Sequence, residues 1–246
     1  MIISKRIRFF LSHLGISIFI VLAVIGLVFG VWYPQPLATA VGVIQIFLML
    51  ILIDIIVGPL LGLLVYREGK KSLKFDLSIV ILLQISALVY GLYNLEQGRP
   101  AWLVYNVDRF ELVRKNELVN NHIQQAQPHF QQPSWFKTQY VATEFAKDTQ
   151  QRNDEMFAEV FSGISIAQRP ERYVELIQAK KKIQQRASPL KELKQYNSEA
   201  EVEKKLEKYP KADAWLPLKA NAVDMVVLIN KEKAEVIKIV DLRPWN

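Results

Sequence analysis

The sequence predicts a membrane protein in which three N-terminal transmembrane helices are followed by a small α+β domain with an antiparallel sheet. Two long uncharged intervals carry the first half of this prediction. No Asp, Glu, Lys or Arg occurs in the 45 residues between Arg8 and Asp54, and none occurs from Leu77 to Leu95. A bilayer-spanning helix needs about 20 such residues, whereas a soluble core does not need them. Charged residues return after Leu95, and the remaining stretch of about 150 residues is long enough to bury a core of its own.

The predicted transmembrane domain occupies residues 1–95. Its spans cover about residues 13–33, 37–66 and 77–95, each bounded by aromatic, proline, glycine or charged residues. The predicted soluble domain occupies residues 96–246.

Basic residues lie before the first span and between the second and third spans. Lys5, Arg6 and Arg8 precede the first span, and residues 67–74 contain four basic side chains and one acidic side chain. The turn between the first two spans is uncharged. By the positive-inside rule, the N-terminus and the second loop are cytoplasmic, and the C-terminal domain is periplasmic if the membrane is a bacterial inner membrane. This topology accounts for the basic excess in the membrane half, so we expect no nucleic-acid partner.

The soluble half alternates short predicted strands and helices. Residues on either side of Val107-Asp108-Arg109 predict a strand or hairpin, and Val223–Asn230 with Ala234–Leu242 predict a terminal hairpin. The other predicted elements are a helix from about Asn116, a loop over 124–134, a strand within Ser134–Phe145, and helices over Asp154–Phe161, Pro170–Gln185 and Ser198–Tyr209.

Motifs of enzymes and metal sites are missing. The chain has no cysteine, which excludes disulfides, thiol nucleophiles and Cys-containing metal sites. Its three histidines do not form an HExxH pattern, and neither a phosphate-binding glycine loop nor a GxSxG motif is present. We therefore expect no catalytic residue, metal, cofactor or small-molecule substrate.

Asp54 is the sharpest functional candidate. A carboxylate at mid-bilayer costs about 2.5–3.5 kcal/mol on insertion scales, so it marks a functional site by default. Pro59 cannot donate a backbone hydrogen bond, and Gly58 and Gly62 allow another helix to approach closely. Together the four residues predict a kinked helix whose polar, small-residue face binds a partner.

Two structural explanations of Asp54 stay open beside this hypothesis. If the helix breaks at Gly58-Pro59, Asp54 lies near the cytoplasmic interface and is hydrated. Alternatively, Asp54 pairs with Gln84 or Ser86 of the third span.

The chain resembles the TfpX/TfpZ-type type IV pilin accessory proteins of Gram-negative bacteria along essentially its whole length. The resemblance rests on the joint order of several short motifs, which are Lys5-Arg6-Ile7-Arg8, Asp54-Ile55-Ile56-Val57-Gly58-Pro59-Leu60-Leu61, Gly98-Arg99-Pro100-Ala101-Trp102, Val107-Asp108-Arg109 and Ala214-Trp215-Leu216-Pro217-Leu218-Lys219-Ala220.

This resemblance implies an inner-membrane protein that helps the major type IV pilin accumulate or assemble. It carries over no catalytic residue. A hypothesis follows in which Asp54 and the Gly58/Gly62 face bind the single membrane helix of pilin, with the carboxylate paired to the processed N-terminal amine. The periplasmic domain would then contact the pilin head.

Two other classes of function compete with this one. A structural subunit of an envelope machine usually has one span and sustained periplasmic heptads, and no such heptads occur here. A small membrane transporter or enzyme generally needs more spans or several intramembrane polar groups, and this chain offers chiefly Asp54, Gln45 and Gln84.

Overall fold

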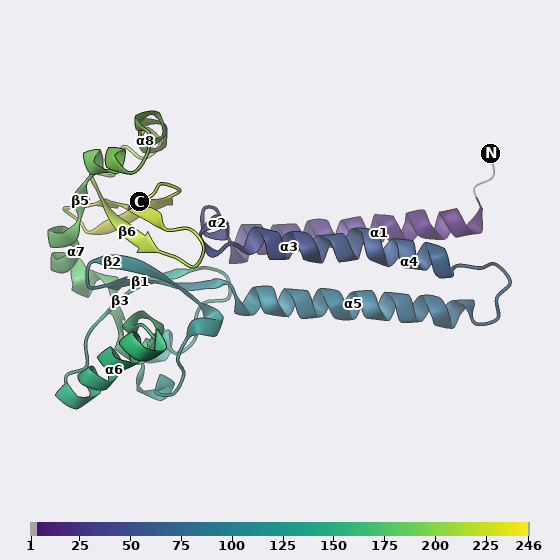
Figure 1. Cartoon of the computed structure of the whole chain (residues 1–246), viewed down its shortest axis with the longest axis horizontal. Helices are drawn as coiled ribbons and strands as arrows, with labels where there is room; N and C mark the ends of the chain where they lie inside the picture. Colours follow the sequence, from purple (N-terminus) through teal and green to yellow (C-terminus); the bar gives the residue numbers. More distant parts are fainter. Residues whose placement is uncertain (1–3, 246) are drawn as a thin grey trace. The chain divides into compact units, whose positions relative to one another are not determined.

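The computed structural model describes residues 4–245, which form two compact units (Figure 1). The first unit holds the chain up to Pro34 together with Val43–Gln97, and the second holds Gln35–Gly42 together with the chain from Gly98 onward. The short segment between the first two apolar helices therefore belongs to the second unit.

The first unit consists of three long helices. They are α1 (Lys5–Leu27) with the π-helical segment η1 (Val28–Trp32), the middle helix made of α3 (Val43–Leu52), the π-helical segment η2 (Ile53–Val57) and α4 (Gly58–Val65), and α5 (Leu73–Gln97). Their mean hydropathies reach 2.9, 2.7 and 2.0, so all three are long and apolar enough to cross a membrane. Both α1 and α5 pack mainly against the middle helix rather than against each other.

The second long apolar helix begins later than the sequence predicts. Residues from Leu37 form a separate short helix, α2 (Leu37–Val41), which ends at Gly42 with a left-handed φ of 79°. A side chain at Gly42 would meet Ala222 at 2.8 Å, so glycine fits both the turn and the close contact. The helix that continues from Val43 to Val65 has 23 residues, or about 35 Å, which suits a bilayer better than the predicted 30-residue span.

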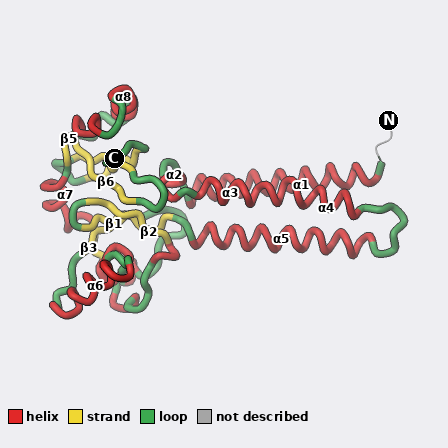
Figure 2. Tube along the Cα trace, viewed as in Figure 1, coloured by secondary structure: helices red, strands yellow, loops and turns green. Residues whose placement is uncertain are grey.

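The second unit is built on a mixed eight-stranded sheet, which Figure 2 shows in yellow among short helices and loops. Its order is β4-β3-β1-β2-β6-β7-β8, and β5 pairs with β6 beside β2. The strands are β1 (Pro100–Asn106), β2 (Arg109–Arg114), β3 (Gln139–Thr143), β4 (Tyr173–Glu175), β5 (Ser188–Pro189), β6 (Ala214–Lys219), β7 (Met225–Asn230) and β8 (Glu235–Val240).

The prediction of an antiparallel sheet is only partly right. The β1–β2 and β7–β8 hairpins are antiparallel as predicted, but β1 pairs with β3 in parallel and β2 pairs with β6 in parallel. Both parallel pairs join strands separated by long connections, which is the only way parallel neighbours can be linked. Alternation within a strand does not report which distant strand lies beside it.

In the second unit one predicted helix is wrong and another is only partly right. Where a helix is predicted from Asn116, the chain forms one short 3-10 turn, η3 (Lys115–Glu117), and then a loop held by a hydrogen bond from Val119 N–H to the Gln168 carbonyl. The predicted helix Pro170–Gln185 is α-helical only from Lys180. Residues Tyr173–Glu175 instead form β4, which pairs with β3, and the ring centroids of Tyr173 and Trp102 lie 5.4 Å apart. Tertiary contacts replace helical hydrogen bonds in both segments.

The remaining helices agree with the sequence in kind. They are α6 (Thr149–Ser162), α7 (Lys180–Arg186) and α8 (Glu199–Leu206), and the last is capped by the Ser198 side chain as predicted. Further 3-10 turns are η4 (Ile123–Gln125), η5 (Pro128–Phe130), η6 (Ile166–Gln168), η7 (Pro170–Arg172), η8 (Leu176–Ala179) and η9 (Leu190–Gln195). The largest core cluster lies on the sheet and includes Leu37 and Ala40 of α2.

Candidate functional site

The π-helical segment η2 leaves one backbone acceptor in the middle helix without its usual donor. Gly58 N–H donates to the Ile53 carbonyl, five residues back, instead of to the Asp54 carbonyl. The next residue that could serve Asp54 is Pro59, which has no N–H. An unpaired carbonyl is costly in the apolar surroundings of this helix, so the Asp54 carbonyl needs a side-chain partner.

Gln84 of α5 supplies that partner. Its Nε2 donates to the Asp54 carbonyl at 2.9 Å and to Ser17 Oγ at 3.0 Å. Because a carbonyl can only accept, the amide nitrogen must face Asp54, and Gln84 Oε1 then faces His13 Nε2 at 2.8 Å. His13 Nε2 therefore donates this bond. The Gln84 side chain thus joins all three helices of the first unit.

The two predicted glycines admit these polar side chains. A Cβ added at Gly58 would lie 2.2 Å from Gln84 Oε1, and one added at Gly62 would lie 3.1 Å from both His13 Nδ1 and Phe9 Cε1. Gly58, Pro59 and Gly62 are all buried within the unit. The groups that approach these two glycines are side chains of α5 and α1. A role of these residues in binding a partner stays a prediction.

The Asp54 side chain is buried without a hydrogen bond. Asp54 is 2% exposed, and neither carboxylate oxygen has a hydrogen-bond partner within residues 4–245. The helix continues through Pro59 to Val65, so Asp54 lies near its middle and not at a broken end. Gln84 lies beside Asp54 but bonds its backbone, and Ser86 donates to the Leu82 carbonyl of its own helix at 2.8 Å.

A cavity of about 210 Å³ opens next to this cluster between α1 and α5. Asp54 lines it together with polar and branched apolar side chains, namely His13, Ile16, Ser17, Ile20, Ile81, Gln84, Ile85 and Leu88. Ile16, Ile20, Ile81 and Ile85 are exposed at its rim. The cavity therefore forms a groove that is open at the outer surface of the helices, has apolar walls, and holds a carboxylate without a hydrogen-bond partner among the described residues. We call it the Asp54 groove.

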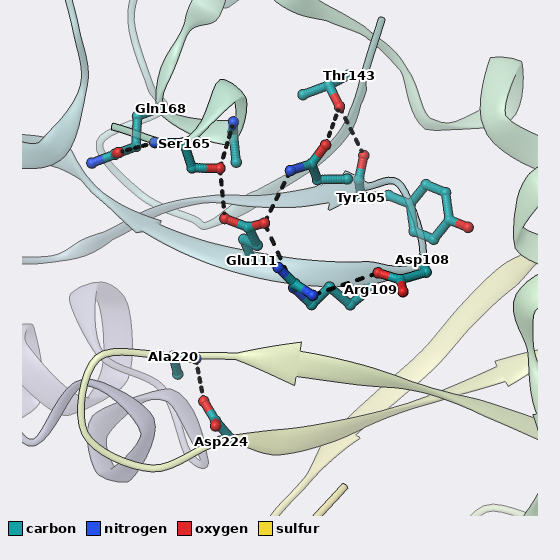
Figure 3. A network of polar contacts seen from close by, with 11 residues as sticks. Tyr105, Asp108, Arg109, Glu111, Thr143, Ser165, Gln168, Ala220 and Asp224 are labelled. Atoms are coloured by element: carbon teal, nitrogen blue, oxygen red, sulfur yellow. Dashed lines mark hydrogen bonds and ion pairs between the residues drawn. The ribbon is translucent and has the colours of Figure 1, made fainter. Parts of the chain in front are cut away.

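A second polar cluster lies in the second unit, at the β1–β2 hairpin (Figure 3). The buried Glu111 carboxylate accepts from Asn106 Nδ2 at 3.0 Å and from Ser165 Oγ at 2.9 Å, and Arg109 Nε lies 3.7 Å from it. Thr143 Oγ1 donates to Asn106 Oδ1 at 3.0 Å. The network connects strands β1, β2 and β3 to the turn η6. It therefore holds in place the β1–β2 hairpin, whose tip is the Val107-Asp108-Arg109 motif.

The tip of this hairpin is exposed and strained. Val107 has a φ of 57° and is 52% exposed, although a β-branched residue is unfavourable in this conformation. A cavity of about 550 Å³ beside it has mixed charges and apolar residues in its wall, including Arg152 and Glu159 from α6. The same helix leaves Met156, Phe157, Val160 and Phe161 exposed. This surface can contact another molecule, but its mixed charges specify no ligand.

Sequence reasoning identified Asp54, Gly58, Pro59, Gly62 and Gln84 but missed the parts played by His13 and Ser17. Both are polar side chains inside an apolar helix, and that isolation was the available signal. Of the other histidines, His129 lies 3.0 Å from Glu175 at the surface. No group of three or more His, Asp or Glu side chains within the described part of the chain could hold a metal ion.

Comparisons with known proteins point to one family. Residues 2–42 match the family described as "Fimbrial assembly protein FimB". Two relatives from Dichelobacter nodosus, named fimbrial assembly protein of serogroup E1 and of serogroup I, are 33% and 32% identical over 180 residues, which cover 72% of this chain and 70% of each relative. A third, of serogroups C1 and C2, is 32% identical over 116 residues, or 46% of this chain and 88% of the relative. No solved structure matches the chain significantly.

Proposed function

Because the chain belongs to the family of fimbrial assembly proteins, we propose that it is an inner-membrane accessory protein of type IV fimbriae that binds the major pilin before assembly. The finer resemblance to TfpX/TfpZ-type accessory proteins is part of this proposal. So is the topology, with the N-terminus in the cytoplasm and the second unit in the periplasm. In this role the protein is a binding, chaperone-like factor and not an enzyme.

The Asp54 groove is the observation that carries the proposal. A pilin subunit before assembly is held in the membrane by a single apolar helix. The groove offers such a helix two branched apolar walls, with Ile16 and Ile20 on α1 and Ile81 and Ile85 on α5. In lipid, helices associate through close packing and polar contacts rather than through the hydrophobic effect, so a shaped groove with a polar floor is a suitable docking site.

The charge of Asp54 gives the groove its selectivity. Since neither oxygen has a hydrogen-bond partner within the described residues, the carboxylate gains most from a partner that brings a cationic donor. The processed N-terminal amine of the pilin helix has the required charge. A glutamate near that amine would repel Asp54, so the amine must lie nearer to Asp54 than the glutamate does.

Gly58, Pro59 and Gly62 contribute to docking indirectly in this proposal. Pro59 has no N–H to donate to the Asp54 carbonyl. Gly58 leaves room for the Gln84 amide, which donates a hydrogen bond to that carbonyl instead. Gly62 makes room for His13, which holds Gln84 Oε1. The three residues thereby fix the orientation of the segment that carries Asp54, while the partner contacts the Asp54 side chain in the groove.

Replacing Asp54 tests the charge. Asp54→Asn keeps the side-chain shape and removes the negative charge, so we expect few surface fimbriae while the protein accumulates normally in the membrane. Ser86→Ala is the matched control, because Ser86 bonds only its own helix and is exposed. Normal fimbriation of the Asp54→Asn strain would exclude this carboxylate from the function.

Photocrosslinking tests the location. A photoreactive amino acid at Ile20 or Leu88, which line the groove, should capture pilin in intact cells. The same group at Leu22 or Leu83 should not capture it, because these side chains are 60% and 64% exposed on α1 and α5 but do not line the groove. Equal capture from all four positions would mean that pilin has no specific site here, and capture of another envelope protein instead would favour a structural role.

A further inference from the structure

Three lysines converge on a pocket in the second unit. The pocket has a volume of about 250 Å³ and lies between the end of α8 and strand β8. Its wall consists of Gln35, Pro36, Lys205, Lys208, Tyr209, Lys238, Ile239, Val240 and Asp241. We call it the lysine pocket. Lys205 lies in the last turn of α8 and Lys208 lies two residues after the helix ends, whereas Lys238 comes from the edge strand β8, which is distant in sequence.

The polar groups of the lysine pocket are nearly all hydrogen-bond donors. Within residues 4–245, none of the three ammonium groups forms an ion pair or a side-chain hydrogen bond. The lysines that form such contacts are Lys5, Lys70, Lys194 and Lys231. The Gln35 amide and the Tyr209 hydroxyl add further donors. The single acid, Asp241, is engaged by Arg243. One lysine on an edge strand is a common guard against strand pairing, but three in one pocket leave an uncompensated positive charge.

Chain connectivity places the lysine pocket close to the membrane surface. Gln35 and Pro36 lie three and four residues after Trp32, the last residue of the first apolar helix. An extended chain advances at most about 3.6 Å per residue, so these two residues lie within about 15 Å of the helix end. The phosphate groups of lipid headgroups occupy this layer.

A separate feature of the second unit also suits the headgroup layer. Trp135 and Phe136 are 44% and 71% exposed, and their rings meet edge to face at 5.0 Å. Their loop is fixed by a hydrogen bond from Thr138 Oγ1 to the Pro100 carbonyl at 3.1 Å. Pro100 lies three residues after Gln97, where the third apolar helix ends. Exposed aromatic rings near such ends are typical of membrane interfaces.

From these features we infer that the second unit binds anionic phospholipid through the lysine pocket, which takes the lipid phosphate while Trp135 and Phe136 enter the headgroup layer. Phosphate offers several acceptor oxygens and a negative charge, matching the donors of the pocket. Phosphatidylcholine, the zwitterionic comparison, presents the same phosphate beside a trimethylammonium group, which the lysines repel. The inference does not depend on the fimbrial role.

Lipid retention by the full-length protein tests this inference. The protein is purified in detergent and titrated with phosphatidylglycerol or with phosphatidylcholine of the same acyl chains, and bound lipids are counted by native mass spectrometry. Replacing Lys205, Lys208 and Lys238 by Gln should weaken phosphatidylglycerol binding about tenfold or more. The matched control replaces Lys181, Lys182 and Lys233 by Gln, since these lysines are exposed, lie outside the pocket and change the charge equally.

The possible outcomes distinguish binding of anionic phospholipid from binding of zwitterionic phospholipid and of free inorganic phosphate. Loss of phosphatidylglycerol in the pocket variant alone supports the inference. Equal loss in both variants would show a general charge effect, and equal retention of phosphatidylcholine by the wild-type protein would exclude selection of anionic lipid. Displacement of the lipid by millimolar inorganic phosphate would show a site for free phosphate. Each of the last three results overturns the inference.

The aromatic pair has its own test. In nanodiscs with brominated phospholipid, Trp135 fluorescence should be quenched, so Trp135→Phe should lose part of the quenching seen in the wild-type protein. The buried Trp215 is the reference, and Trp215→Phe should leave the quenched fraction unchanged or larger. Identical quenching of the wild-type and Trp135→Phe proteins would remove the aromatic pair from the inferred surface.

Discussion

A single glutamine, Gln84, supplies the hydrogen-bond donor that the backbone of the middle helix lacks at Asp54. Pro59 and the π-helical segment leave the Asp54 carbonyl without a backbone donor, and Gln84 Nε2 occupies the missing position at 2.9 Å. Gln84 can reach this carbonyl because residue 58 has no side chain. An aspartate, a glycine, a proline and a glutamine on two helices thus act together, and changing one of them changes the environment of the others.

At this scale we predict that Gly58→Ala destabilises the protein by about 1–3 kcal/mol, because the added methyl group would overlap the Gln84 amide. The measurement is the thermal unfolding midpoint in detergent micelles. Gly15→Ala is the control, since a methyl group there meets nothing within 4 Å and should be neutral or slightly stabilising. Equal midpoints for the two variants would contradict the packing of Gln84 against Gly58.

Two tyrosines of the second unit predict how it responds to alkaline pH. Burial raises the pKa of Tyr105 to about 12, with a further contribution from the charge of Asp108, and burial alone raises the pKa of Tyr140 to about 12. The unfolded chain releases these protons near pH 10. The folded state therefore binds more protons above pH 10, and its stability decreases as the pH rises from about 10 to about 12.

Absorbance of the phenolate checks this pH dependence. In the native protein part of the tyrosine absorbance change should be delayed to about pH 12 or to the unfolding transition, whichever comes first. Replacing both Tyr105 and Tyr140 by Phe should reduce that delayed part without abolishing it, because burial also raises the pKa of Tyr173 well above its usual value. A single transition near pH 10 in a protein that is still folded would show that these hydroxyls are solvated.

Elements of the second unit depend on neighbours that are remote in sequence. Strand β6 contains Pro217, which usually argues against a central strand. Its residues Ala214 and Trp215 pair with β5 and its last two residues pair with β2, so Pro217 lies where one neighbour ends and the next begins. The helix α2 likewise packs into the sheet core through Leu37, while the Ala40 carbonyl accepts from the N–H groups of Ala222 and Val223.

Because α2 is part of the sheet core, replacing its buried leucine should destabilise the second unit. Leu37→Ala should destabilise the second unit by about 2–5 kcal/mol, because Leu37 is 5% exposed and its removal leaves a cavity. Tryptophan fluorescence during thermal unfolding reports the change. Leu64→Ala provides the comparison, because Leu64 is 71% exposed on an apolar helix of the first unit and should change the midpoint little. If Leu37→Ala proved as mild as Leu64→Ala, residues 37–41 would be an ordinary connecting turn.

The chain crosses between the two units three times. The chain leaves the first unit after Pro34, returns to it at Val43 and leaves it again after Gln97. The second unit therefore includes the segment that joins the first two apolar helices as well as the segment after the third. The domain assigned to residues 96–246 from the sequence lacks α2, which contributes Leu37 and Ala40 to its core.

Orientation is the prediction at this scale. Because the chain has no cysteine, single cysteines can report the location of each loop directly. A cysteine at Lys233, in the β7–β8 turn, should react with an impermeant maleimide in cells with an opened outer membrane. A cysteine at Lys71, between the second and third apolar helices, should react only after the inner membrane is permeabilised. The opposite pattern would invert the topology derived from the basic residues.

The sequence by itself determined the three apolar helices, the presence of Asp54 within one of them and the terminal hairpin, whereas the structure decided that this helix continues past Asp54 without a break. Each of these depends on the order of residues along a short stretch: the length of an uncharged run, a lone carboxylate within it, or alternation in neighbouring strands. Gln84 could be suggested as a partner of Asp54 because few polar residues occur in the spans. The parallel strand pairs could not be predicted, because alternation within one strand does not identify its neighbour.

Only the tertiary structure decided how distant residues combine. It placed Gln84 against Gly58, opened the groove between α1 and α5 beside Asp54, moved Leu37 into the core of the second unit, and gathered lysines from α8 and β8 around one pocket. These arrangements depend on the packing of helices and strands whose residues lie tens to hundreds of positions apart. No local pattern encodes that packing, because the free energy that selects it comes from surfaces that meet only when the chain is folded.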